Sequence, residues 1–372
     1  MSAAPAAQRL AWADALKGLA CIAIVWHHLS VYGPMVDVAY PLAPRLVDWL
    51  YGYGRMAVQV FLVLAGYLAA ASLAPLGAAD FDRPWGHIGR RYRRLAGPYL
   101  VALTAAVLAA WVARLGPHPA SVPAAATLAQ ALAHMLLLQS LLDADSLSAG
   151  VWYIAIDLQL YALTVGGLHL SRCLAQRWQI PPSWLSLGLL SALMAVSLGY
   201  FNLDTRWDTT ALYFAGSYGM GVLAYWGGSE LPTPWRKACL AVLVLSGVVG
   251  LTWAFRERIM LAWAVALVLA LLARRASLVG LRYPVAAPLL SLGRMSYSVF
   301  LIHYPICLLV NAGMGRWWPD QPAVNALGWA VAFVLSLLAA RLMHRFVESQ
   351  PTGWTGIAGL TATLCVAAGA VA

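Results

Sequence analysis

The most informative spacing of ionisable side chains lies in the first apolar stretch of the sequence. Asp14, Lys17, His27 and His28 all occur there, although a charged side chain costs about 3 kcal/mol or more at the centre of a bilayer. Lys17 and His28 are eleven residues apart, which in a helix is about three turns, or ~16 Å of rise. Asp14, Lys17 and His28 therefore share one stripe, whereas His27 points about 100° away. A cation near one end and an imidazole further in predict one wall of a polar pathway.

The composition indicates which kind of element carries this stripe. Of the 372 residues, 62% are hydrophobic and 10% are charged, compared with about 25% charged in soluble domains. The apolar residues form blocks of roughly 17–25, the length that crosses about 30 Å of hydrocarbon. We therefore expect an all-α, polytopic transmembrane helix bundle. The first block is interpreted as a retained span rather than a signal peptide.

Charge and cysteine content argue against two classes of function. The formal net charge of +10 fits arginines that mark cytoplasmic loops, so no nucleic acid is expected as a partner. The five cysteines have no metal-ligand spacing and lie mostly in apolar runs: Cys21, Cys173, Cys239, Cys307 and Cys365. We expect no bound metal and no disulfide framework.

About ten spans are predicted, and they cover residues 15–32, 55–74, 97–113, 150–170, 183–200, 211–227, 237–254, 258–273, 285–311 and 324–343. The positive-inside rule then places the basic loops and the N-terminus in the cytoplasm. The cluster of Arg274, Arg275 and Arg282 lies in the cytoplasm only if residues 124–142 do not cross the membrane. We therefore favour an outer-face or re-entrant helix for residues 124–142 over a further span. One domain is predicted over 1–372, with a core of about 9–351. The weaker apolar segment 352–372 would supply an eleventh span.

Two more polar sites are predicted at the depth of His28. Asp157 lies in the outer half of the fourth predicted span, and His303 lies in the outer half of the ninth. A buried carboxylate can fix the tautomer of an imidazole and raise its basicity, so His28 and Asp157 would form such a pair if they touch. The alternative for His27 and His303 is a structural hydrogen bond across helices.

A run of arginines, RRYRR at residues 90–94, precedes the third predicted span. Guanidinium groups bind phosphates through two parallel hydrogen bonds, so the run, together with Lys17 and Arg345, predicts a phosphate funnel on the cytoplasmic face. The alternative is that the run serves only as a topology signal. Trp152 and Tyr161 are likewise either site residues or interface aromatics. An anionic donor inside and a histidine further out favour group transfer towards the outer face.

Six segments, taken in order, resemble the motifs of the acyltransferase-3 family of integral membrane O-acyltransferases, which includes bacterial O-antigen, exopolysaccharide and Nod-factor O-acetylases. They are the stripe of Asp14, Lys17 and His28, then FLVLAGYL, RRYRRLAGPY, WYIAIDLQLY, LGRMSYSVFLIHYP and FVESQP. The resemblance runs from Arg9 to about Pro351. The chain departs from the family pattern at four places: Lys17 replaces arginine, Ala65 replaces serine, Asp157 replaces glutamate, and one extra residue precedes Pro351.

The resemblance implies transfer of an acyl group, most often acetyl, from cytoplasmic acetyl-CoA to a hydroxyl of a cell-surface or lipid-linked glycan, such as an exopolysaccharide or lipopolysaccharide. His28 would act as general base or transient acyl carrier, with Asp157 orienting it. The residues expected to hold CoA are Lys17, Arg90, Arg91, Arg93, Arg94 and Arg345. The residues expected to support the site or line its acceptor side are Asp14, Trp152, Tyr161, Ser296, Tyr297, His303 and Glu348.

The same resemblance implies a multi-pass protein of the bacterial inner (cytoplasmic) membrane with a cytoplasmic N-terminus. It names neither a particular acceptor nor an oligomeric state. The alternative is a transporter or flippase for a lipid-linked or anionic sugar, for which inverted repeats would be typical; none is evident. A non-enzymatic membrane scaffold or sensor is the third hypothesis.

Overall fold

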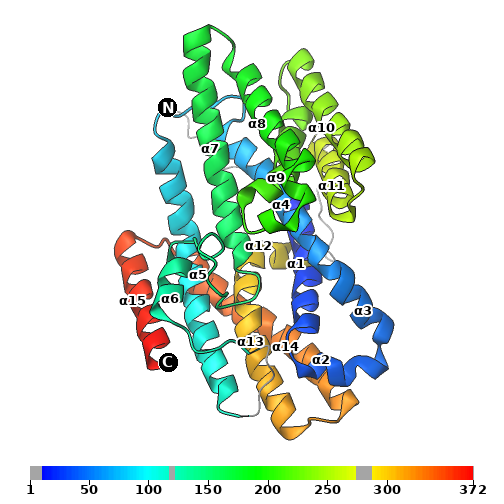
Figure 1. The fold of residues 1–372 in the computed structure, drawn as a ribbon, viewed down its shortest axis with the longest axis vertical. Coiled ribbons are helices and arrows are strands. Elements are labelled where there is room, and N and C mark those ends of the chain that lie inside the picture. Colours follow the sequence, from blue (N-terminus) through cyan, green and yellow to red (C-terminus); the bar gives the residue numbers. More distant parts are fainter. Residues whose placement is uncertain (1–10, 117–121, 274–286, 372) are drawn as a thin grey trace.

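The computed structural model describes residues 11–116, 122–273 and 287–371, and Figure 1 shows that this part of the chain is built from helices without strands. The helices are α1 Ala11–Val31, α2 Pro34–Ala39, α3 Pro44–Tyr53, α4 Ala57–Leu73, α5 Pro84–Arg114, α6 Leu128–Met135, α7 Trp152–Trp178, α8 Pro182–Gly199, α9 Ala211–Gly228, α10 Thr233–Trp253, α11 Glu257–Ala273, α12 Ala287–Arg294, α13 Ser296–Trp317, α14 Pro322–Met343 and α15 Trp354–Ala370. The all-α expectation is confirmed for the described residues.

Seven helical segments of the described chain are long and apolar enough to cross a bilayer. An eighth is counted if α1 and the segment Pro34–Leu42, which meet at a bend of 89°, form one broken span. The expected count of ten is therefore not confirmed. The difference lies in α9 and α11, which occupy two of the predicted spans but are not among the seven.

Residues 124–142 do not cross as a helix. Their helical part, α6, has eight residues, which rise only about 12 Å. It starts at a capping box in which the Thr127 side chain accepts the backbone N–H of Gln130 and the Gln130 side chain accepts that of Thr127. The structure thus agrees with the favoured alternative. The cluster of Arg274, Arg275 and Arg282, which motivated it, lies outside the described residues.

The helices that surround the predicted site pack closely through small residues. A Cβ on Gly66 of α4 would overlap the backbone oxygen of Tyr218 on α9, and a Cβ on Gly221 of α9 would overlap that of Val63 on α4. Glycine therefore lets the two backbones touch, as is common between membrane helices. Tyr67, beside Gly66, lies edge-on to Trp12 of α1 with ring centroids 5.3 Å apart. These contacts hold α1, α4 and α9 as one unit.

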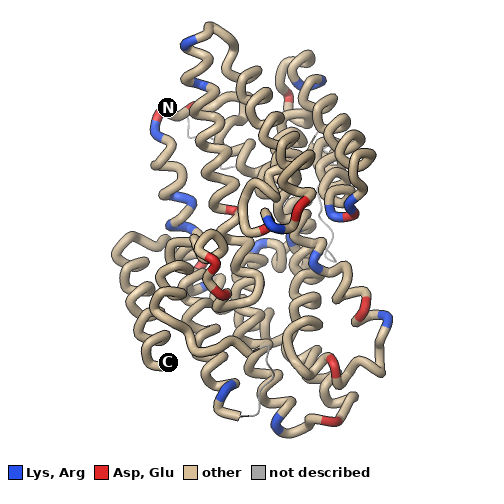
Figure 2. The backbone as a smooth tube through the Cα atoms, viewed as in Figure 1, with Lys and Arg blue, Asp and Glu red and all other residues tan. Residues whose placement is uncertain are grey.

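Charged residues are concentrated at helix ends and in connections, except along the first half of α5 (Figure 2). This helix has 31 residues and is therefore ~46 Å long, against about 30 Å of hydrocarbon. Its apolar half contributes to the buried core, whereas its first three turns carry RRYRR. The excess length is thus the part of α5 that bears the arginines. The C-terminal helix α15 has 17 residues and packs against α5 and α6.

Candidate active site

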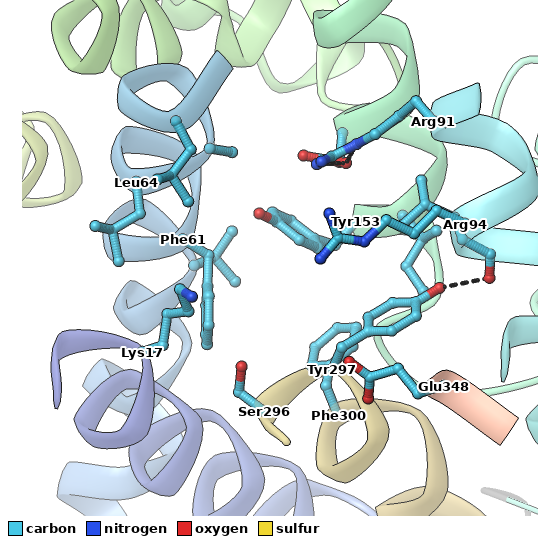
Figure 3. Close-up of a pocket in the computed structure, with 16 residues that line it drawn as sticks. Lys17, Phe61, Leu64, Arg91, Arg94, Tyr153, Ser296, Tyr297, Phe300 and Glu348 are labelled. Carbon is cyan, nitrogen blue, oxygen red and sulfur yellow. Dashed lines mark hydrogen bonds and ion pairs between the residues drawn. The ribbon is translucent and has the colours of Figure 1, made fainter. Parts of the chain in front are cut away.

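Three neighbouring cavities contain most of the residues predicted from the sequence. The one that we call the central cavity has a volume of about 190 Å³ and is enclosed by α1, α4, α5, α7 and α13. Figure 3 shows Lys17 and Phe61 on one side of it, with Arg94 and Tyr153 opposite. Its polar lining consists of Lys17, Arg91, Arg94, Tyr153, Asp157, Ser296, Tyr297 and Glu348.

The other two cavities adjoin the central cavity on different sides. The mouth cavity, of about 390 Å³, is lined by Arg90, Arg93, Arg94, Glu348, Ser349, Gln350, Pro351 and Thr352. It shares Arg94 and Glu348 with the central cavity. The histidine cavity, of about 520 Å³, contains His27 and His28 and shares Val58 and Phe300 with the central cavity. The central cavity therefore shares lining side chains with each of the other two cavities.

Two ion pairs compensate cations of the central cavity. Lys17 Nζ lies 2.9 Å from Asp14 Oδ1 one turn earlier on α1, as their shared stripe predicts. Arg91 holds Asp157 Oδ2 through Nη2 at 2.6 Å and Nε at 3.2 Å. The Asp157 side chain is only 6% exposed, and the Arg91 guanidinium also lies over the Tyr161 ring, 5.3 Å from its centroid. Arg91 thus makes a buried structural pair with Asp157.

This ion pair corrects the expected contact between His28 and Asp157. Asp157 faces Arg91 in the central cavity, and the described hydrogen bonds of its carboxylate are those from Arg91. The physical reason is that a buried carboxylate gains more from a two-point bond to a permanent cation than from a neutral imidazole.

His28 instead bonds to His303 of α13. The distance from His28 Nδ1 to His303 Nε2 is 2.8 Å, and the two rings are stacked at an interplanar angle of 12°. His303 Nδ1 lies 3.3 Å from the carbonyl oxygen of Val299, to which it can only donate. If both rings are neutral, His303 Nε2 accepts a hydrogen bond from the N–H of His28 Nδ1. The nitrogen that keeps an unused lone pair is then His28 Nε2. The hydrogen bonds thus assign His28 the tautomer that is protonated on Nδ1, with Nε2 free to accept a proton.

Gly150 holds the histidine pair from the other side. Its φ is +75°, and a Cβ there would lie 2.9 Å from His28 Cε1 and 2.8 Å from the Phe300 ring. Any side chain would therefore push into the wall between the central and histidine cavities. The second histidine, His27, bonds through Nδ1 to the carbonyl oxygen of Leu50 at 2.9 Å, which matches the structural role expected as its alternative.

The remaining predicted residues fall into three groups. Ser296 donates to the Gly293 carbonyl, Tyr297 to the Leu95 carbonyl at 2.9 Å, and Glu348 accepts from Ser298 at 2.5 Å. Trp152 lines the histidine cavity. Arg345 lines none of the three cavities and lies over the Phe346 ring, so the structure gives no support for its expected contact with CoA phosphates.

The histidine cavity also contains charged residues that were not predicted from the sequence: Arg55, Asp208, Arg256, Glu257 and Arg258. They come from the connections around α4, α9 and α11, all of which the predicted topology places outside. Arginines are scarce in outer loops, so their presence there was the signal that could have found them. Among the residues that the structure describes, no group of three histidine, cysteine or acidic side chains could hold a metal ion.

Comparison with known proteins fits this architecture. The sequence profile described as "Acyltransferase domain" matches residues 10–345, nearly the whole chain. The chain therefore belongs to the acyltransferase-3 family, a class of membrane-embedded acyltransferases. It is also 27% identical, over 152 residues, to a Caenorhabditis elegans protein named "Regulator of hypoxia-inducible factor 1". That match covers 41% of this chain and 30% of the relative. No solved structure matches the chain.

Proposed function

We propose that this protein is a membrane O-acyltransferase that moves an acetyl group from cytoplasmic acetyl-CoA to a hydroxyl of a cell-surface or lipid-linked glycan. One observation carries the proposal: the His28–His303 pair packs beside Phe300, the side chain that the histidine cavity shares with the arginine-lined central cavity. A base between two chambers suits a reaction whose two substrates arrive from opposite sides. The bacterial inner membrane, with a cytoplasmic N-terminus, is the proposed location.

The mouth and central cavities suit the two chemically different parts of CoA. Arg90, Arg93 and Arg94 line the mouth without a described carboxylate in ion-pair contact, so their charges are available to the phosphates. The central cavity continues from there between polar groups and the apolar side chains of Phe61 and Leu64, and this lining fits the pantetheine arm. The thioester would then reach the wall formed by Val58 and Phe300.

The histidine pair can perform the transfer at this wall. The acceptor hydroxyl gives its proton to His28 Nε2 while its oxygen attacks the thioester carbonyl carbon. As the new C–O bond forms, the C–S bond breaks, and the proton on His28 passes to the departing CoA thiolate. The products are an O-acetyl ester and CoA, with no net change at the protein. His303 acts as a positioning residue because its bond to Nδ1 keeps Nε2 of His28 free.

The ion pairs of the central cavity have a different role in this proposal. Asp157 fixes the Arg91 guanidinium, and Asp14 fixes Lys17, beside the path of the donor. Neither carboxylate takes part in proton transfer. The proposed base is therefore supported by a second imidazole rather than by the carboxylate expected from the sequence.

The test is acetylation of cell-surface glycan, measured by NMR, together with release of CoA by the purified protein. His28→Ala is expected to lower both by roughly 10²–10⁴-fold, the usual contribution of a general base. His27→Ala is the matched control, since the two residues are neighbours and His27 bonds to a backbone carbonyl. Unchanged acetylation in a normally expressed His28→Ala protein would reject the role of His28. Sugar movement without CoA release would instead favour a flippase.

A further inference from the structure

The histidine cavity contains three arginines without a carboxylate partner. Arg55, Arg256 and Arg258 line it, and none of them forms an ion pair within 4.0 Å with a described residue. Lys17 and Arg91 of the central cavity each have such a partner. Of the central cations only Arg94, which the mouth cavity shares, has no such partner. Cations gathered in a cleft attract anionic ligands, so the histidine cavity has the larger set of cations still available to a ligand.

Two of these arginines are held in place by neutral groups. Arg256 donates to Asn202 Oδ1 at 2.8 Å and to the backbone carbonyls of Leu198, Gly250 and Ala254. Arg258 donates to the Asn202 carbonyl at 3.4 Å, and its guanidinium lies over the Tyr213 ring, 4.8 Å from the centroid. Such bonds fix the position of a guanidinium without cancelling its charge. The cations are thus arranged before any ligand arrives, which lowers the entropy cost of binding.

The acidic residues of the cavity do not neutralise this set. Asp208 and Glu257 line it as well, which leaves an excess of positive charge in the lining. Burial raises the pKa of the Asp208 carboxyl, and the nearby charge of Arg258 opposes this shift. Burial, and then the neighbouring charge of Arg258, lower the pKa of Arg256. An anion between the two guanidinium groups would relieve their repulsion.

The rest of the cavity suits a sugar. Its volume of about 520 Å³ lies within the range of small-molecule sites, roughly 300–1,000 Å³. Trp152 and Phe214 form a stacked aromatic wall, with ring centroids 5.4 Å apart and an interplanar angle of 28°. Aromatic faces carry partial negative charge and can therefore hold the C–H face of a sugar ring. His28 belongs to the same lining, so a sugar held there would lie beside the proposed base.

We propose that the acceptor is an anionic saccharide. Its carboxylate or phosphate is held by Arg55, Arg256 and Arg258 while one of its hydroxyls reaches His28 Nε2. This inference rests on the proposed function and adds to it the chemical class of the acceptor. The topology signal does not explain these arginines, because the charge pattern of the sequence assigns their segments to the outer face, where arginine is scarce.

The test is a binding titration on the full chain in lipid nanodiscs, without acyl-CoA. One probe is a tetramer of galacturonic acid, and its matched neutral probe is the same tetramer with every carboxyl reduced to the alcohol. A third probe is the neutral tetramer carrying one phosphate monoester, which distinguishes carboxylate from phosphate recognition. We expect at least one charged probe to bind about tenfold more tightly than the neutral tetramer, with a preference that falls as salt is added.

The assignment to particular residues is tested with Arg55→Gln and Arg258→Gln. Each is expected to reduce the preference for the charged probe about tenfold. Arg206→Gln is the control, since Arg206 is paired with Asp204 and does not line the cavity; it should keep the preference. If Arg258→Gln does not fold, Arg55→Gln decides, because the Arg55 side chain is exposed and has no described hydrogen bond or ion pair that its loss would break.

Equal binding of charged and neutral probes overturns the inference. A preference for the charged probe that survives both in the Arg55→Gln protein and in a folded Arg258→Gln protein overturns it as well. These outcomes are separate from failure of the proposed function. Acetyl transfer to a neutral glycan that depends on His28 would reject the anionic acceptor and leave the acyltransferase in place. Charge-selective binding without any CoA release would support an anionic ligand and reject the acyltransferase.

Discussion

The central cavity and the histidine cavity both hold cations, but two of the three cations in the central cavity are ion-paired, whereas none of the three arginines in the histidine cavity is paired with a described residue. In the central cavity, Lys17 and Arg91 are matched by Asp14 and Asp157 at 2.9 and 2.6 Å. In the histidine cavity the arginines bond to carbonyls, an amide and an aromatic ring. A paired cation serves mainly the structure, whereas an unpaired cation at a cavity is available to a ligand. The distinction separates Arg91 from its neighbours Arg90, Arg93 and Arg94.

The largest expected effect comes from breaking the buried pair. Asp157→Asn leaves the Arg91 charge, 29% exposed in its side chain, without a counter-charge, and should lower the free energy of unfolding by about 3 kcal/mol. The measurement is thermal unfolding of the detergent-purified protein. Asp204→Asn is the control: its partner Arg206 is 87% exposed, so at most about 1 kcal/mol should be lost.

A double variant sharpens this prediction. Replacing both partners with apolar residues, Arg91→Met with Asp157→Leu, should recover more than half of the lost stability, since no buried charge remains unpaired. If Asp157→Asn were as stable as the parent protein but lacked activity, Asp157 would have a chemical role after all, and the contrast between the two cavities would fail at this residue.

A smaller effect is expected at the histidine pair. His303→Ala removes the acceptor of the His28 Nδ1 proton, so His28 can turn or change tautomer, and kcat for acetyl transfer should fall roughly 10- to 100-fold. The KM for acetyl-CoA should stay unchanged because His303 does not line the donor cavities. His303→Gln, whose amide oxygen can accept the same proton, should restore part of the rate. A change in KM alone would argue against the positioning role.

The smallest expected effect is at the mouth. Arg94→Gln should raise the KM for acetyl-CoA about tenfold, which corresponds to one charge-assisted hydrogen bond, with kcat preserved. Acetyl-pantetheine, which lacks the nucleotide phosphates, should show no such change. Arg345→Gln is the matched control and should alter the KM less than twofold, since it lines none of the three cavities. An effect of Arg345→Gln equal to that of Arg94→Gln would restore the phosphate funnel expected from the sequence.

Helical periodicity was sufficient to predict which side chains lie together where both residues belong to one helix. It placed Asp14 beside Lys17, and it separated His28 from His27, which the structure shows bonded to the Leu50 carbonyl. Apolar block length was also informative, because most predicted spans correspond to observed helices. The predicted number of crossings is not confirmed, since α9 and α11 do not reach the span criteria of length and apolarity.

Contacts between helices could not be obtained in this way. Loop charges give the depth of a residue but not the rotation of its helix, so His28, Asp157 and His303 were predicted at one depth, with His28 and Asp157 as the pair expected if they touch. Rotation turns Asp157 towards Arg91 and leaves His303 to His28. Arg256 of the histidine cavity belongs to a connection whose path depends on the packing of α8, α10 and α11, which no periodicity describes.

The wall shared by the central and histidine cavities also bears on how the membrane stays sealed. A lipid bilayer excludes ions over the full depth of its hydrocarbon, whereas here two cavities meet at the side chains of Val58 and Phe300, and Gly150 packs against Phe300. In the proposed function, these few side chains would carry the permeability barrier. The acetyl group would have to pass only this contact between the cavities, and CoA would stay on the side from which it came. The residues that shorten the path of the acyl group would then be the same ones that prevent leakage.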